Sequence, residues 1–154
     1  MIQNNAAATT SSSGWTVSGV GSIVKVGDAS SAITFLAGGD LSFACDLQIT
    51  ANATLNLNDK NMTLSGDFVR SAASAVFNAG GTSSTVTFSG AAQNVNVTAV
   101  DGTTPTDSDI TFNHITISGT NVKLFYFKTN DRKLNFNNFT VNNGAVVTLY
   151  SNPQ

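Results

Sequence analysis

Residues 86–90 read Val86-Thr87-Phe88-Ser89-Gly90, and the chain returns to this pattern at a nearly fixed interval. The first and third positions are apolar and the second is small and polar, which is the period of two expected for a strand with one buried face. The copies start 21, 24, 24 and 24 residues apart, at Leu41, Met62, Val86, Ile110 and Leu134.

A strand of this kind cannot bury its apolar face alone. Repetition every 21 to 24 residues lets each coil stack on the previous one, with backbone hydrogen bonds between coils about 4.8 Å apart. The sequence therefore predicts an all-β, single-stranded parallel β-helix, or β-solenoid. Two interior columns are expected to contain Leu41, Phe43, Met62, Leu64, Val86, Phe88, Ile110, Phe112, Leu134 and Phe136.

Small or amide side chains follow each copy of the strand, as in Ser65-Gly66, Ser89-Gly90, Asn113-His114 and Asn137-Asn138. Gly and Asn accept positive φ, so these pairs predict a recurring corner. In the coil from 86 to 109 the next strand, 93–97, is displaced relative to its neighbours. We expect a bulge or an altered corner there.

The length of 154 residues fits one domain. We expect residues 1–13, rich in Asn, Ala, Thr and Ser, to be flexible, because they offer little apolar surface to bury. Residues 14–40 are interpreted as an N-terminal cap and first coil, and 41–154 as the solenoid coils. The turn-rich run 101–109 is expected to protrude as a loop.

Charged residues make up only 10% of the chain, all nine acidic residues are Asp, and the formal net charge is −2. This composition provides no basic stripe for a phosphate backbone, so nucleic acid is not expected as a partner. The first ten residues lack the basic and apolar regions of a signal peptide, and no apolar run approaches the ~20 residues of a membrane span. With one cysteine, Cys45, an internal disulfide is excluded.

The segments 86–93 and 110–119 together resemble the right-handed parallel β-helix repeats of bacterial surface and adhesin-like proteins. In those repeats a Phe-x-Gly-x-x-Gln segment precedes a Phe-x-x-hydrophobic-x-hydrophobic strand. Trp15-Thr16-Val17, leading to Val26-Gly27-Asp28, is similar to the way such regions open. The style is shared with phage tail spikes and fibres. The resemblance implies a right-handed coil, extracellular exposure and a binding or scaffold role, and it transfers no catalytic residue.

Candidate catalytic residues are few. A Ser-His-Asp arrangement would have to use His114, the only histidine, which occupies a predicted corner. Cys45 falls in the same corner column and is interpreted as a structural thiol. A glycosidase needs two carboxylates across a cleft, but the Asp residues are expected at different phases of the coil, without a column: Asp40, Asp46, Asp59 and Asp67. We therefore expect no enzymatic activity and no cofactor.

Two further patterns have a simpler and a functional interpretation. Asp101, Asp107 and Asp109 are weak candidates for oxygen ligands of Ca²⁺ from one loop, because ordinary Asx turns are the favoured explanation and the bidentate Glu of an EF-hand is missing. A hydroxyl column, of the kind found in ice-binding solenoids, would contain Ser42, Thr63, Thr87 and Thr111. A single column is also what surface strands favour.

The expected interaction surface is apolar. Leu124, Phe125, Tyr126 and Phe127 break the alternation, so some of these side chains must point outward, where they either contact another chain or pack under a loop. The final coil adds Val146, Val147 and Leu149, and no charged residue occurs from 135 to 154. Unprotected strand edges recruit other strands. We therefore expect a homo-oligomer, assembled end to end or side by side.

Three classes of function remain after this reasoning. The first is a non-enzymatic surface fibre or adhesin-type module, with a surface glycan as a possible partner. The second is a phage spike or tail-fibre attachment protein on a virion surface, and the third is a glycan-active β-helix enzyme. The repeat favours the first two, because the pattern that recurs along the chain is a structural one and contains no recurring catalytic residue.

Overall fold

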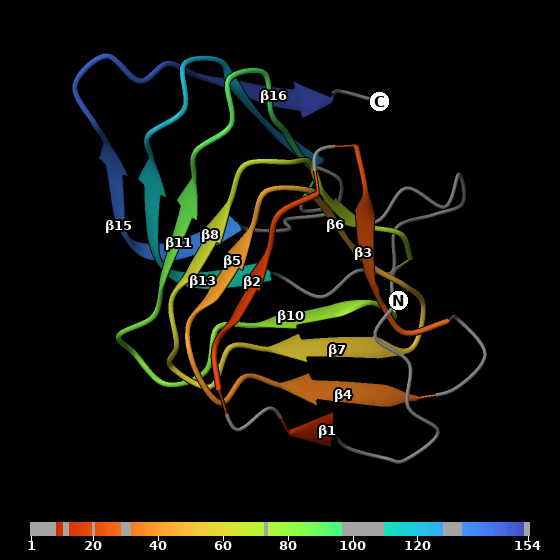
Figure 1. Cartoon of the computed structure of the whole chain (residues 1–154). Coiled ribbons are helices and arrows are strands. Elements are labelled where there is room, and N and C mark those ends of the chain that lie inside the picture. Colours follow the sequence, from red (N-terminus) through yellow and green to blue (C-terminus); the bar gives the residue numbers. More distant parts are fainter. Residues whose placement is uncertain are drawn as a thin grey trace.

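A computed structural model describes residues 9–10, 13–19, 21–28, 32–72, 74–96, 110–127 and 134–152. All regular elements in these ranges are strands, and they form three parallel sheets (Figure 1). The β1 sheet contains β1 (Thr9–Thr10), β4 (Ile33–Leu36), β7 (Ala53–Asn56) and β10 (Val76–Asn78). Thr9 and Thr10 belong to the segment 1–13 that was expected to be flexible, and they pair with Phe35 and Leu36.

The two other sheets have six strands each. The β2 sheet contains β2 (Trp15–Val17), β5 (Leu41–Phe43), β8 (Met62–Leu64), β11 (Thr85–Phe88), β13 (Ile110–Ile117) and β15 (Leu134–Val141). The β3 sheet contains β3 (Ile23–Val26), β6 (Asp46–Ile49), β9 (Phe68–Arg70), β12 (Asn94–Asn96), β14 (Val122–Phe127) and β16 (Val147–Asn152).

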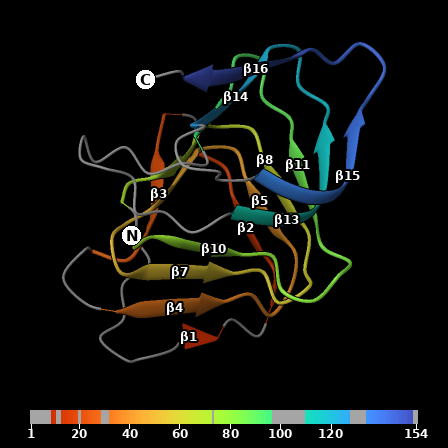
Figure 2. The same ribbon diagram turned by 180° about the vertical axis from the view of Figure 1, so that it is seen from behind.

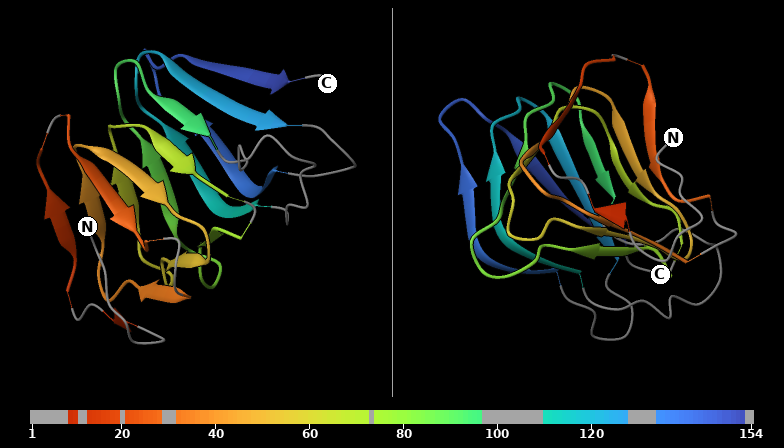
Figure 3. Two further views of the ribbon diagram at one scale, coloured as in Figure 1. Left: turned by 90° about the vertical axis from the view of Figure 1, so that its right-hand side faces the viewer. Right: turned by 60° about the horizontal axis from the view of Figure 1, so that its bottom comes forward.

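The chain visits the three sheets in turn, so β1 to β12 form four coils of three strands around a common core (Figure 3). Strands β13 to β16 extend two of the sheets by two further rungs. The strand pairings within the described ranges are all parallel and join one coil to the next. The predicted parallel β-solenoid is therefore confirmed.

Alternating apolar positions build the core. Phe43, Leu64 and Phe88 point inward from one column of the β2 sheet and are buried. Neighbouring rings meet edge to face, as Phe68 does with Phe88 at a centroid distance of 6.4 Å. Trp15 closes the N-terminal side with its ring 4.9 Å from that of Phe35.

The predicted register is wrong in one place. Ile115 and Ile117, and not Ile110 and Phe112, pair with Val86 and Phe88. The rung from Val86 to Ile115 is therefore 29 residues long, since 115 minus 86 is 29, and not 24. Phe112 is still fully buried, but its ring lies 4.8 Å from Phe77 of β10 and 6.2 Å from Phe88.

The bend in β13 explains this difference (Figure 2). Asn113 has no pairing partner, whereas the residues on both sides of it pair with β15. Its buried amide donates to the Gly80 carbonyl at 3.1 Å and the Ser84 hydroxyl at 3.0 Å. One strand thus runs beside β10 with its first half and continues the β2 sheet with its second half.

Asn113-His114 and Asn137-Asn138 lie inside strands, so neither pair is a corner between strands of the kind predicted, and Asn113 instead marks the bend within β13. The corner after β13 is Ser118-Gly119. A Cβ at Gly119 would collide with the Gly90 carbonyl, and one at Gly90 would collide with the Ser65 carbonyl. At Gly90 and Gly119 the backbone of the neighbouring coil therefore leaves no room for a Cβ, whereas Cys45 occupies the same column one coil before Gly66.

Candidate functional site

His114 lies on the outer face of β13, half-buried, and pairs with Thr85 and Asn138 in the neighbouring coils. Its Nδ1 is 2.9 Å from the Asn138 Nδ2, so the amide donates and the imidazole accepts. The nearest Asp in the same column is Asp40, three rungs away through Asn61 and Thr85. Three rungs correspond to about 14 Å. Among the described residues of this column, His114 therefore has no carboxylate near enough to orient it as a catalytic base.

The Asp residues are arranged more regularly than predicted. Asp46, the first residue of β6, and Asp67, directly before β9, occupy equivalent places, which corrects the expectation that no Asp column exists. Asp46 accepts a hydrogen bond from the Asp67 backbone N–H at 2.8 Å, and Asp67 accepts one from the Asn94 backbone N–H at 2.7 Å. Each carboxylate thus accepts a hydrogen bond from the backbone N–H of the residue at the equivalent place in the next coil.

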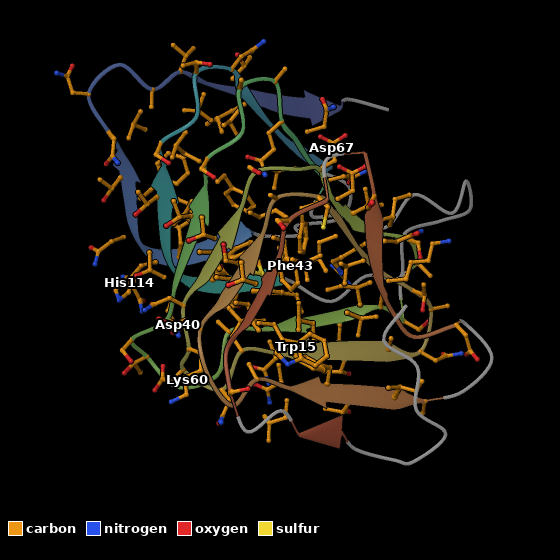
Figure 4. All side chains as sticks on the ribbon, viewed as in Figure 1. Trp15, Asp40, Phe43, Lys60, Asp67 and His114 are labelled. Atoms are coloured by element: carbon orange, nitrogen blue, oxygen red, sulfur yellow. The ribbon has the colours of Figure 1, made fainter. Side chains whose placement is uncertain are left out.

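A second ladder of this kind runs along the opposite corner, where Figure 4 shows Asp40 and Lys60 on the side away from Asp67. Asp40 accepts from the Asn61 backbone N–H at 2.8 Å, and the Asn61 side-chain oxygen accepts from the Thr85 backbone N–H at 3.0 Å. These acidic and amide groups satisfy backbone donors at corners. They do not face each other across a cleft, as paired catalytic carboxylates do.

Asp59 belongs to the exposed turn between β7 and β8, at φ 64°. Its carboxylate accepts from the Ser83 backbone N–H at 2.8 Å. This hydrogen bond, followed by contributions from the Ser83 hydroxyl and neighbouring N–H groups, holds the pKa of Asp59 below its ordinary value. The Asp59 carboxylate is therefore an anion whose hydrogen bond joins one coil to the next.

Cys45 is buried at the corner between β5 and β6. Burial, and next the nearby charge of Asp46, raise the pKa of its thiol. A buried thiol of raised pKa carries little of the reactive thiolate, so the structural interpretation of Cys45 agrees with its surroundings.

Sequence reasoning missed two buried polar side chains. Gln93 fills the corner before β12, where its oxygen accepts from the Gly90 N–H at 3.1 Å and its nitrogen donates to the Leu64 and Gly66 carbonyls. This is the altered corner that the displaced strand predicted. Arg70 points inward at the end of β9 and its Nε donates to the Ala75 carbonyl at 2.8 Å. The sequence signal for this residue is an Arg at a position where the alternating pattern of the strand predicts a side chain that points into the core.

The last rung of the stack exposes the apolar surface. Strands β15 and β16 end their sheets, so no described strand covers them (Figure 1). We call the apolar side chains of this rung the C-terminal face: Phe136, Phe139, Val141, Val146, Val147 and Leu149. Phe136 and Val141 are each 44% exposed, and Leu149 is 57% exposed. Phe136 was predicted to be interior, and it is exposed on the last described rung of its sheet.

The predicted interface residues are brought together only in part. Val147 packs against the core, while Val146 is 53% exposed. The backbone of Leu124, Phe125, Tyr126 and Phe127 pairs with β16, but these side chains lie outside the described part of the structure. The same applies to the whole of the candidate Ca²⁺ loop with Asp101, Asp107 and Asp109, and to the loop 101–109 expected to protrude.

Within the described ranges, no three His, Cys, Asp or Glu side chains gather as a metal site, and no helix is present that could cross a membrane. Comparison with protein-family models, curated proteins and solved structures finds no match to this chain.

Proposed function

We propose that the chain is a non-enzymatic structural or attachment β-solenoid, which acts at a cell or virion surface and self-associates. The C-terminal face carries the proposal, because it combines exposed Phe136, Val141 and Leu149 with two strand edges that have no described neighbour. The absence of charged residues from 135 to 154 leaves this edge without the usual protection against strand addition.

The use of the polar residues supports a structural rather than a catalytic role. Asp40, Asp46, Asp59 and Asp67 all accept hydrogen bonds from backbone N–H groups of the next coil. The one histidine contacts the Asn138 amide, and no contact to a carboxylate of the described residues accompanies it. We expect purified protein to leave the viscosity of polysaccharide solutions unchanged. Cleavage that is lost on substitution of any one Asp would establish an enzyme instead.

A surface rich in hydroxyl and amide groups, with 10% charged residues, favours work outside the cell in either setting, bacterial surface or phage particle. A surface glycan is the attachment partner that such a surface fits best, since sugar hydroxyls pair with neutral donors and acceptors. This part of the proposal is tested by binding of the chain to glycan arrays.

Association is expected to run end to end. The C-terminal strands β15 and β16 occupy the same two sheets as β2 and β3 at the other end, so a second copy can continue both sheets. A contact between different ends of two copies is heterologous and does not close, and it produces fibres. Side-by-side contact through Leu124 to Phe127, which the sequence predicts as interface residues, is the alternative geometry.

Sedimentation velocity at rising protein concentration tests the proposal. The double variant Phe136→Asn/Leu149→Asn removes apolar side chains that are about half exposed, each of which would contribute ~1 kcal/mol when covered, so the association constant should fall about 30-fold. Val76→Asn is the matched control, because Val76 is an exposed apolar residue on the lateral β1 sheet. A wild-type chain that stays monomeric at high micromolar concentration would refute self-association.

A further inference from the structure

The outer surface of the β2 sheet repeats one polar pattern through all six rungs. The corrected register places one outward residue of each strand in a single column: Thr16, Ser42, Thr63, Thr87, Thr116 and Thr140. The residues two positions later form a second column beside it: Ser18, Ala44, Ser65, Ser89, Ser118 and Asn142. We call these two columns the hydroxyl face.

All twelve side chains of the hydroxyl face are half-buried or exposed. Within the described part of the chain, none of the six hydroxyls of the first column makes a hydrogen bond to another protein group. Hydroxyls elsewhere are used internally, as when Thr50 donates to the Val26 carbonyl at 2.9 Å and Ser71 to the Ile49 carbonyl at 3.1 Å. The first column of the hydroxyl face thus keeps its donors and acceptors for something outside the chain, whereas in the second column the Ser89 hydroxyl donates to the Leu64 carbonyl at 3.3 Å and Ala44 has no polar side-chain atom.

Strand propensity alone does not produce this surface. If Thr stood there only because it suits exposed strands, the outward columns of the other two sheets should show the same preference. The corresponding column of the β3 sheet changes from Lys25 to Gln48 to Val69. The β1 sheet also loses its hydroxyl where Thr54 is followed by Val76. Only the β2 sheet keeps a hydroxyl in the same column through six rungs.

The spacing of the hydroxyls points to a periodic ligand. Adjacent rungs repeat about every 4.8 Å, and side chains two residues apart on one strand repeat about every 6.6 Å. Water oxygens joined by hydrogen bonds of about 2.75 Å in a tetrahedral network have second neighbours about 4.5 Å apart and a layer repeat of about 7.3 Å. The spacing between rungs and the spacing along a strand each differ from the corresponding spacing of the water network by about a tenth or less. Hydroxyl hydrogens also rotate to suit their partners.

We propose that the hydroxyl face binds the ordered water of an ice surface. The β-branched Thr side chain holds its χ1 angle stiffly, so the column presents its hydroxyls in a fixed orientation before contact. No charged side chain interrupts either column, and a charge would hold its own hydration shell against the lattice. No aromatic side chain is present either, and aromatic rings are the apolar bodies on which flat ring-shaped ligands usually stack. This absence disfavours a crystalline polysaccharide as the occupant.

The test is the partition of the full chain into slowly growing ice, compared with an inert protein of similar size. We expect the wild type to be incorporated into ice and Thr87→Lys, in the middle of the hydroxyl face, to lose this incorporation. Thr54→Lys makes the same change on the outer surface of the β1 sheet and should keep it. Circular dichroism melting verifies folding, and Ser65→Lys in the second column repeats the test if Thr87→Lys does not fold.

Two results would overturn the proposal. The first is exclusion of the wild type from ice to the same extent as the inert protein. The second is incorporation of Thr87→Lys and Ser65→Lys at the wild-type level, because then another surface binds. Binding of the wild type to microcrystalline cellulose, together with exclusion from ice, would assign the hydroxyl face to a crystalline polysaccharide instead. Neither result depends on self-association, which is measured separately.

Discussion

Replacing Phe112 by Ala tests the corrected stacking of the core. The Phe112 side chain is fully buried, with the rings of Phe77 and Phe88 at 4.8 and 6.2 Å. Its removal leaves a cavity between two coils that rigid strands cannot close, and we expect a loss of about 3 to 5 kcal/mol in the free energy of unfolding. Because an ordinary domain is stable by about 5 to 15 kcal/mol, this loss is a large part of the total.

Phe136→Ala is the matched comparison, since Phe136 pairs with Phe112 in the next rung of the same column. Phe136 is 44% exposed, so roughly half of the burial is lost on truncation and the expected cost is about 1.5 to 2.5 kcal/mol. Guanidinium unfolding followed by circular dichroism, at concentrations low enough to keep the chain monomeric, gives both values. If both variants lost the same free energy of unfolding, the conclusion that the C-terminal face is uncovered would be refuted. If Phe112→Ala left the free energy of unfolding nearly unchanged, the conclusion that Phe112 belongs to the core would be refuted.

Gln93→Ala removes the partner of the Gly90 N–H and of the Gly66 carbonyl, while the Leu64 carbonyl keeps the Ser89 N–H, and it should lower the free energy of unfolding by about 1 to 3 kcal/mol, whereas the half-exposed control Gln48→Ala should change it little. Asp59 has a folded-state pKa below its ordinary value of 3.8, so its stabilising contribution is complete above that pH and disappears as the pH falls through the folded-state pKa. Asp59→Asn should therefore flatten the loss of stability in acid, and an unchanged acid profile would contradict the Ser83 hydrogen bond. The thiol of Cys45, with its raised pKa, should react with iodoacetamide at pH 8 only after unfolding, and rapid labelling of the native chain would show that it is accessible.

The sequence predicted the solenoid because its strongest signal, alternation repeated at a fixed interval, is the signal that fixes stacking. From Leu41 to Phe88 the predicted and observed registers agree. Beyond Phe88 they diverge, because Ile110-Thr111-Phe112 and Ile115-Thr116-Ile117 fit the same alternating pattern equally well. Five residues separate the two alternatives, and spacing alone favoured the wrong one.

The register is decided by contacts that no local pattern contains. Asn113 reaches two groups of the previous coil's corner, 33 and 29 residues earlier in the chain, and this places the bend. The Asp46 to Asp67 ladder was not predicted for a related reason. It depends on a rung of 21 residues, which is shorter than the interval of 24 residues that dominates the repeat. Long-range hydrogen bonds set the rung lengths, and side-chain columns follow from them.

The corrected register also changes what the outer surface can do. In the register expected from spacing, Thr111 would follow Thr87, and the next corner would bring Asn113 to the place beside Ser89, so the second column would lose its hydroxyl. In the observed register Thr116 follows Thr87 and Ser118 follows Ser89. The observed register of β13 therefore extends the serine run of the second column from Ser65 and Ser89 to Ser118. A core amide and an outer hydroxyl array are thus linked through strand register, and substitution of Asn113 by Ala should disturb both the stability of the fold and the ice partition of the hydroxyl face.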